Sequence, residues 1–302
     1  MHARVEARPG ALLVLPVAAL AFLAGVLTQA AVSQTSGGKP SSPQGRFGFD
    51  RFGRIVLDRE KAAVPCPPQT ERTAVILAMG QSNAANHAGQ GFASRHGAKI
   101  VNFFDGACYV AASPLLGATG VQGEYWTETA NGLIDSGAYD AVVLSVVAVG
   151  GVPVARFAKD GDLNPLVAAA AADFARGGYR VTHALWVQGE SDARDETSAE
   201  EYRARFRSVV ATLRARQPDP RLEVFVGVAT KCLPFRPYDP QLPVAIELRR
   251  LGASGEGLRA GVDTDVLLGE LDRYDQCHFA GSGAEKAARA WAEIIAKDRS
   301  NP

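Results

Sequence analysis

The chain carries no excess of charge of either sign, because 32 lysine and arginine residues balance 32 aspartate and glutamate residues. A neutral balance gives no support for a nucleic-acid partner, which a basic surface would attract. Glycine, proline and cysteine are too scarce for a collagen-like, disordered or small disulfide-rich protein. With 302 residues, 47% of them hydrophobic, the chain can bury one sizeable α/β core and still carry a tail.

Several ligand-binding patterns are also missing. The chain has neither Gly-x-Gly-x-x-Gly nor a P-loop, so nucleotide binding has no support. Its five histidines and four cysteines lack the spacing of zinc ligands. No internal repeat occurs at solenoid or propeller spacing. We therefore expect a function that depends on neither a metal nor a nucleotide.

The N-terminus holds the longest apolar run. Arg4 and Arg8 precede an apolar stretch from Ala11 to about Val32, with small residues near its end. This order is typical of a secretory signal peptide, and the run is also long enough to be an uncleaved membrane anchor. Either reading of residues 1–32 predicts that the rest of the chain is exported.

The next part of the chain has little regular pattern. Residues 33–45 are rich in Ser, Gly and Pro, which is typical of a flexible linker. Only a weak strand signal follows, at 53–57. We expect 33–72 to be a linker and lead-in segment, and 73–299 to be the compact domain.

Strand and helix patterns alternate from residue 73 onward. Apolar runs of strand length are followed by segments whose apolar residues recur at helical spacing. This alternation predicts a parallel sheet covered on both faces, whose strands all end at one edge. The predicted strands are 74–79, 99–104, 141–148, 181–187 and 222–229, and the predicted helices are 125–134, 163–175, 198–216 and 283–296.

Ser82 follows the first of these strands at a tight Gly80-Gln81 turn. Ligands of parallel α/β folds bind at the carboxyl ends of strands. A serine in this place can simply cap a helix. It can also be a nucleophile, provided that a base and oxyanion donors lie elsewhere in the chain.

Two further polar segments are predicted at the same edge. The fourth strand runs into Gln188-Gly189-Glu190, whose amide can donate to an oxyanion or belong to a loop that caps the next helix. Near the C-terminus, Asp275 and His278 lie three residues apart. Such an aspartate can fix the imidazole tautomer so that the other ring nitrogen acts as a base. The alternative is an ordinary surface turn.

The four cysteines allow three disulfide pairings. Cys232 follows the fifth strand, and Cys277 lies between Asp275 and His278 at the same edge. We therefore predict that Cys232 pairs with Cys277, which leaves Cys66 with Cys108. An exported chain can keep such bonds oxidised, and four reduced thiols are the alternative.

Together these segments resemble the SGNH hydrolase superfamily, in the branch of sialate O-acetylesterase-like and acetylxylan esterase-like proteins. The lipase-like branch has Asp before the serine and Asn in the third block, where this chain has Gln81 and Gln188. The resemblance covers about 73–296. It implies a three-layer α/β/α sandwich with a flavodoxin-like parallel sheet. The segments that carry it are Gly80-Gln81-Ser82-Asn83, Trp186-Val187-Gln188-Gly189-Glu190-Ser191-Asp192 and Asp275-Gln276-Cys277-His278-Phe279.

The resemblance also implies residue roles. Ser82 matches the nucleophile, His278 the base and Asp275 its orienting partner. The oxyanion hole would consist of the Ser82 backbone N–H, the Gln188 side chain and the N–H of Gly123. Gly120 is the second choice for this glycine. The further residues expected to line the site are Asn83, Gly151 and Glu190, with His87 at its rim.

The implied activity is that of an exported serine esterase, without a cofactor, that removes O-acetyl groups from a carbohydrate. We expect it in the periplasm, secreted, or anchored outside the membrane by the N-terminal apolar segment. The expected partner is an acetylated carbohydrate, with no nucleic acid. The alternatives are a lipase or thioesterase of the same superfamily, or a non-catalytic glycan-binding envelope protein on the same fold.

Overall fold

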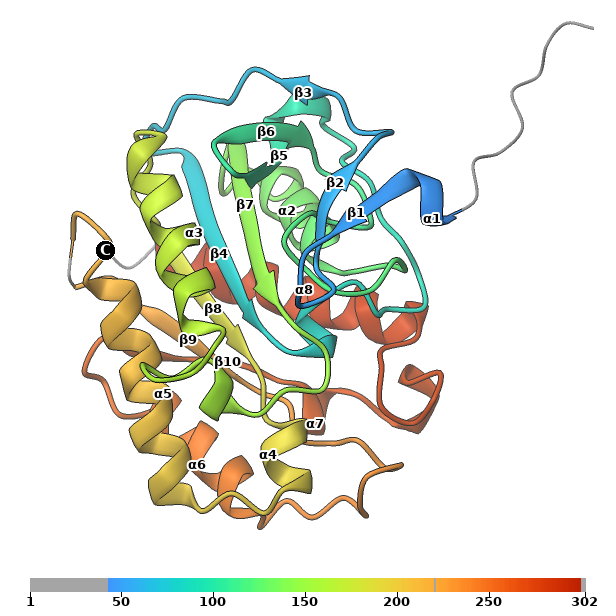
Figure 1. Ribbon diagram of the computed structural model, residues 1–302, viewed down its shortest axis with the longest axis vertical. Helices are drawn as coiled ribbons and strands as arrows, with labels where there is room; N and C mark the ends of the chain where they lie inside the picture. The colour runs from blue at the N-terminus through green and yellow to red at the C-terminus, as the bar shows by residue number, and fades with distance from the viewer. Residues whose placement is uncertain (1–42, 220, 300–302) are drawn as a thin grey trace, which may run out of the picture. The chain divides into compact units, whose positions relative to one another are not determined.

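A computed structural model describes residues 43–219 and 221–299 (Figure 1). The predicted signal peptide or anchor at 1–32 and most of the Ser/Gly/Pro-rich linker lie outside these residues. Within the described part, no helix combines the length and the apolar character needed to cross a bilayer.

Eight strands form one sheet, which is mostly parallel, as predicted. Its strands, in spatial order, are β10 (Leu258–Asp263), β9 (Val224–Val228), β8 (His183–Val187), β4 (Thr73–Gly80), β7 (Ala141–Ala148), β5 (Ile100–Phe104), β6 (Ala107–Val110) and β3 (Ala63–Val64). The strands from β10 to β5 run parallel. The last two pairings, β5 with β6 and β6 with β3, are antiparallel. A parallel arrangement brings the carboxyl ends of β4, β7 and β8 together at one edge.

The central strand β4 is buried on both faces, which explains its unbroken apolar sequence. Val75 and Leu77 belong to the core on one face of the sheet. Ile76 and Ala78 belong to the core on the other face. Alternate side chains therefore anchor the strand in two separate cores, which fixes its register and the position of the turn that follows.

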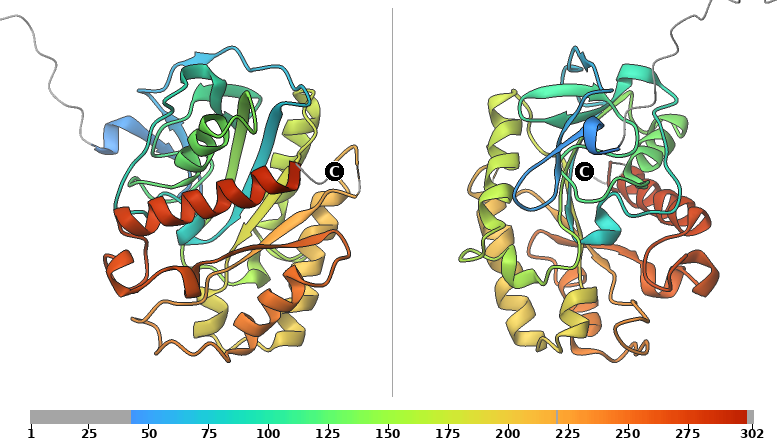
Figure 2. Two further views of the ribbon diagram at one scale, coloured as in Figure 1. Left: turned by 180° about the vertical axis from the view of Figure 1, so that it is seen from behind. Right: turned by 45° about the vertical axis from the view of Figure 1, so that its right-hand side comes forward.

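Helices cover both faces of the sheet, and the predicted sandwich is confirmed. One face carries α2 (Trp126–Asp135) and α8 (Gly281–Arg299); the other carries α3 (Asn164–Arg176), α5 (Ala199–Arg214) and α6 (Pro243–Gly252). Figure 2 shows α8 crossing the sheet on the face away from α3 and α5. The remaining helical turns are α1 (Pro43–Arg46), η1 (Ser82–Ala84), η2 (Gly97–Lys99), η3 (Val154–Arg156), α4 (Glu190–Arg194), α7 (Thr264–Leu267) and η4 (Glu270–Asp272).

The described part of the expected lead-in segment is folded. Its strands β1 (Phe47–Phe49) and β2 (Ile55–Asp58) form an antiparallel hairpin, and β3 joins the main sheet. Ile55 donates its N–H to the Ala118 carbonyl and accepts from the Gly117 N–H. The hairpin is therefore attached to a loop that leads into the candidate site.

Candidate active site

One cavity of about 350 Å³ lies at the carboxyl edge of the sheet. It contains Ser82 from the turn after β4 and His278 from the loop before α8. These residues are far apart in sequence, and the parallel topology brings them together. The residues that line the cavity are Phe52, Gln81, Ser82, His87, Thr119, Val149, Gly150, Gly151, Phe235, Cys277 and His278.

Ser82 is the first residue of the short 3₁₀ turn after β4. The turn needs glycine at position 80, because a Cβ there would lie 1.9 Å from the Val187 carbonyl oxygen. The Ser82 hydroxyl forms no hydrogen bond with any residue of 43–219 or 221–299, and the 3₁₀ turn has no side-chain cap. Ser82 is therefore not a helix cap, and its hydroxyl is available to act as a nucleophile.

Asp275 holds His278 from two directions. Its Oδ2 atom lies 2.6 Å from His278 Nδ1, and its Oδ1 accepts the backbone N–H groups of Cys277 and His278 at 3.0 and 2.6 Å. Burial opposes ionisation of Asp275, but these hydrogen bonds outweigh it, so its pKa is lowered. A carboxylate at Nδ1 favours the tautomer that leaves Nε2 available as a base.

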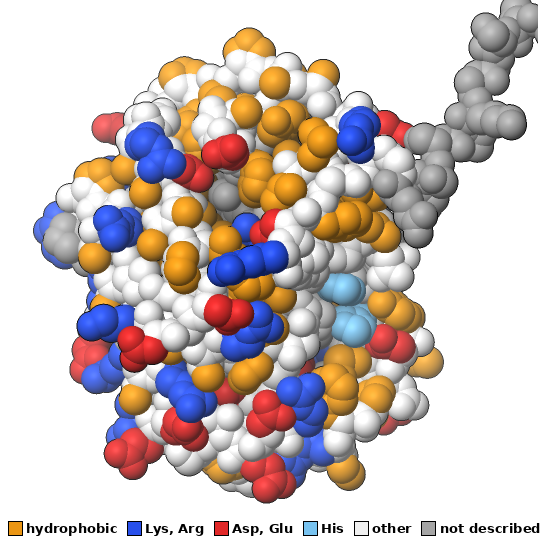
Figure 3. Space-filling view, in the orientation of Figure 1, with side chains coloured by type: hydrophobic (Ala, Val, Ile, Leu, Met, Phe, Trp, Pro, Cys, Tyr) orange, Lys and Arg blue, Asp and Glu red, His pale blue; other side chains and the backbone are white. Residues whose placement is uncertain are grey.

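His87 lies beside this base. Its ring stacks on the His278 ring, with centroids 5.4 Å apart, and its Nε2 is 3.2 Å from Thr119 Oγ1. Burial, followed by the neighbouring His278, lowers the pKa of His87 to about 4. His87 is therefore neutral near pH 7 and adds no second positive charge beside the base. Figure 3 shows histidine side chains exposed together beside a hollow in this face.

The predicted oxyanion role of Gly123 is not supported. Its N–H donates to the Ala88 carbonyl at 3.0 Å, and the residue does not line the cavity. Gly150 lies nearer to the nucleophile and lines the cavity, and a Cβ on it would lie 3.7 Å from Ser82 Cβ. Its N–H is also engaged, however, because it donates to Thr119 Oγ1 at 2.9 Å.

The predicted oxyanion role of Gln188 also lacks support. Its side chain is fully buried and outside the cavity. The amide nitrogen has three acceptors within 3.1 Å, namely Gln81 Oε1, the Val152 carbonyl and Asp192 Oδ2. The amide oxygen accepts from the Tyr202 hydroxyl at 2.9 Å. Both ends of the amide are engaged inside the protein, so Gln188 joins loops behind the nucleophile.

Of the three residues expected to line the site, only Gly151 does so. Asn83 and Glu190 are buried behind the nucleophile, where Asn83 Nδ2 donates to Glu190 Oε1 at 2.6 Å. The same nitrogen also donates to the Cys277 carbonyl at 3.3 Å. Burial raises the pKa of Glu190 to about 7, against the opposing hydrogen bond from Asn83. Asn83 therefore connects the Ser82 turn both to the start of α4 and to the His278 loop.

Both predicted disulfides are confirmed. Cys232 pairs with Cys277, and Cys66 pairs with Cys108. The first bond ties the loop that carries Asp275 and His278 to the segment after β9. It therefore restrains the candidate base.

Sequence reasoning missed Thr119, Phe52, Val149 and Phe235 as residues of the cavity. Thr119 directly precedes Gly120, the second candidate for the oxyanion glycine, so the glycine-rich sequence could have indicated it. Phe52 had no such signal, because it comes from the expected lead-in. The two phenylalanines and the valine give the cavity an apolar wall.

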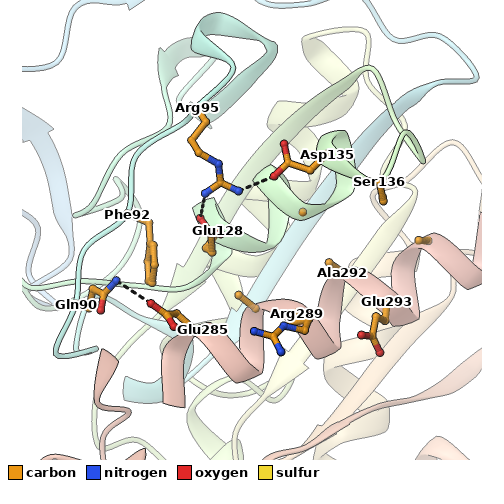
Figure 4. Close-up of a pocket in the computed structure, with 13 residues that line it drawn as sticks. Gln90, Phe92, Arg95, Glu128, Asp135, Ser136, Glu285, Arg289, Ala292 and Glu293 are labelled. Carbon is orange, nitrogen blue, oxygen red and sulfur yellow. Dashed lines mark hydrogen bonds and ion pairs between the residues drawn. The ribbon is translucent and has the colours of Figure 1, made fainter. Parts of the chain in front are cut away.

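A larger cavity of about 650 Å³ lies between α2, α8 and the loop at 90–95. Figure 4 shows that Arg95 there is paired with Glu128 and Asp135, and Gln90 with Glu285. Among the described residues that line it there is no histidine or cysteine. Its serine, Ser136, donates its hydroxyl to the Leu133 carbonyl and has no histidine beside it in the lining, so the smaller cavity at Ser82 is the candidate active site.

Solved structures share this fold. A protein from Arabidopsis thaliana superposes with a TM-score of 0.59 at 18% identity, covering 77% of this chain and 99% of the other. An acetyl esterase mutant solved with an acetate ion has a TM-score of 0.50 at 9% identity, covering 76% and 99%. A search of curated proteins finds no match.

Residues 72–296 match the family described as carbohydrate esterase, sialic acid-specific acetylesterase. The match spans most of the chain, so this protein belongs to that family of SGNH-type hydrolases. The membership supports a hydrolase that acts on esters.

Proposed function

We propose that this protein is an exported serine esterase that removes O-acetyl groups from a carbohydrate. The observation that carries the proposal is the meeting of Ser82 with the Asp275–His278 pair in one cavity. The family supports an acetylated sugar as the substrate, with O-acetylated sialate as the first candidate. The two disulfides support export, since they persist in oxidising compartments.

The mechanism follows from the assigned roles. His278 Nε2 accepts the Ser82 proton while Oγ attacks the ester carbonyl. The imidazolium then donates that proton to the departing sugar oxygen, which leaves as a hydroxyl group. A water molecule repeats the attack on the acetyl-enzyme and releases acetate. We assign the Ser82 backbone N–H to the oxyanion hole. We assign no glycine beside it, because the N–H groups of Gly123 and Gly150 both donate to other groups of the protein.

The test compares Ser82→Ala with Ser136→Ala, a substitution of an exposed serine at the end of α2. Ser82→Ala should abolish hydrolysis of acetyl esters and labelling by a fluorophosphonate, while circular dichroism stays unchanged. Ser136→Ala should retain both. Near wild-type hydrolysis by Ser82→Ala would contradict the proposed nucleophile.

Two other outcomes identify the alternatives. A wild-type protein that binds acetylated glycans but is neither labelled nor active is a non-catalytic binder. A preference for long acyl chains over acetyl, measured over a series of chain lengths, identifies a lipase or thioesterase. Release of acetate from a panel of acetylated glycans, including O-acetylated sialate, would identify the sugar.

A further inference from the structure

The cavity at Ser82 is completed by a residue from outside the family-matched region. Phe52 lies in the turn between β1 and β2, whereas the match begins at residue 72. The catalytic roles proposed above all fall within 72–296, and this hairpin contributes an aromatic ring to their cavity.

The hairpin is held in place by several contacts with the loop at 117–119. Besides the two backbone hydrogen bonds of Ile55, Arg54 forms a bridge with Thr119. The buried Arg54 side chain also pairs with Asp50 at 2.8 Å, across the turn that contains Phe52. Because Thr119 lines the cavity itself, the hairpin and the cavity wall form one connected structure.

Contacts with the core and with two arginine side chains fix the position of the Phe52 ring. It packs against the hydrophobic core on the α3 and α5 face of the sheet. The guanidinium groups of Arg51 and Arg156 lie 4.6 and 6.0 Å from its ring centroid. A ring held in this way is a preorganised surface, which reduces the entropic cost of binding a ligand.

The rest of the lining favours recognition through apolar contact. Phe235 is 44% exposed and lines the same cavity, as does Val149. None of the described residues that line this cavity is Lys, Arg, Asp or Glu. A pyranose ring offers a face of C–H groups, which matches an aromatic surface, while its hydroxyls can remain in water.

We propose that Phe52, together with Phe235, forms an aromatic platform for the pyranose ring of the acetylated substrate. The ring would stack on this platform while its ester carbonyl lies at Ser82. The inference rests on the proposed esterase function and adds a determinant of specificity. Phe52 would thus make the enzyme prefer esters of sugars over small esters without a ring.

The experiment compares Phe52→Ala with Phe49→Ala, using glucose pentaacetate and ethyl acetate as substrates. Phe49 is the matched control, because it lies in the same hairpin, is 49% exposed and does not line the cavity. Phe52→Ala should lower kcat/KM for glucose pentaacetate about tenfold, mainly through KM. Ethyl acetate should change by less than about twofold, and Phe52→Trp should retain the preference for the sugar ester.

An unchanged ratio of the two kcat/KM values in Phe52→Ala would overturn the inference. Equal losses on both substrates with a lower Tm would overturn it as well, because they indicate a structural role. In either case, hydrolysis that requires Ser82 leaves the proposed esterase function standing. If the wild type hydrolyses neither substrate, or if Ser82→Ala is as active as the wild type, the esterase proposal fails and the platform with it.

Discussion

The loop at 275–279 and the segment at 188–192 both contact the Ser82 turn, and they use polar residues in opposite ways. His278 faces the cavity, with Nδ1 held by Asp275. Gln188 is fully buried, and both ends of its amide are bonded inside the protein. A position at a strand end therefore does not decide whether a polar side chain serves chemistry or structure.

The difference arises from what surrounds each segment. Asp192 accepts from Gln188 Nε2 and from the Val154 backbone N–H at 2.6 and 2.7 Å, and Thr197 donates to its other oxygen. This carboxylate therefore joins the end of β8 to the loop after β7. In the 275–279 loop, distant partners such as Asn83, Leu233 and Gly89 donate to backbone carbonyls. The His278 side chain is held by its near neighbour Asp275, which leaves its ring in the cavity wall.

The largest expected effect would come from Asp275→Asn, which removes the carboxylate that holds the imidazole. We expect kcat on an acetyl ester to fall about 10³–10⁴-fold, as in other triads, because the amide favours the wrong tautomer. The control is Asp135→Asn, since Asp135 Oδ1 lies 2.7 Å from His96 Nε2 in a pair outside the cavity. The test is a comparison of kcat for the two folded variants by steady-state kinetics. Equal values would show that Asp275 has no catalytic role.

The two disulfides provide the next comparison. They close loops of similar length, with separations of 45 and 42 residues, so each should contribute about 4 kcal/mol by restricting the unfolded chain. Only Cys232–Cys277 restrains the His278 loop. We expect the double Cys232→Ala, Cys277→Ala variant to lose activity about tenfold or more at temperatures where it is folded. The double Cys66→Ala, Cys108→Ala variant should lose stability but keep its activity when folded. Equal activities of the two double variants would show that Cys232–Cys277 does not restrain the catalytic loop.

The buried segment at 188–192 should make the stability of the protein depend on pH, through the carboxyl group of Glu190. Its pKa is raised from 4.5 to about 7, chiefly by burial, so the folded state holds this proton more tightly than the unfolded state. Its contribution to stability is therefore complete below pH 4.5 and is lost as the pH rises through 7. Relative to Glu190→Gln, the wild-type free energy of unfolding should fall by about 3 kcal/mol across this range. Urea unfolding of both proteins at several pH values measures these free energies. If the difference between the wild type and Glu190→Gln stays constant with pH, Glu190 does not ionise in this range.

The smallest effect on catalysis is expected from Gln188→Ala. The substitution leaves Asp192 Oδ2 and Gln81 Oε1 without their amide donor, so the free energy of unfolding should fall by about 1–3 kcal/mol. The folded fraction should keep kcat on ethyl acetate within a few-fold of wild type. A loss of about 10² or more in kcat at unchanged stability would instead return the Gln188 amide to the oxyanion hole.

The sequence alone was enough for the elements at the centre of the fold. Strands such as β4 and β7 are buried on both faces, so their apolar runs are unbroken and easy to recognise. The strands β3, β6 and β10 were missed because they are short or half-exposed at the sheet edges. The Asp275–His278 contact was predictable because the two residues are three apart, and a short loop keeps them close.

Tertiary structure decided everything that depended on distant partners. The direction of the Gln188 amide follows from Val152 and Asp192, and the Gly123 N–H is engaged by Ala88. Neither set of hydrogen bonds can be recognised from the local amino-acid sequence. Phe52 reaches the cavity only because its hairpin bonds to a loop more than 60 residues away in sequence. Local periodicity and short spacings therefore determined the sheet and the reacting pair, whereas the cavity wall and the buried amide network depended on which distant backbone groups needed hydrogen-bond partners.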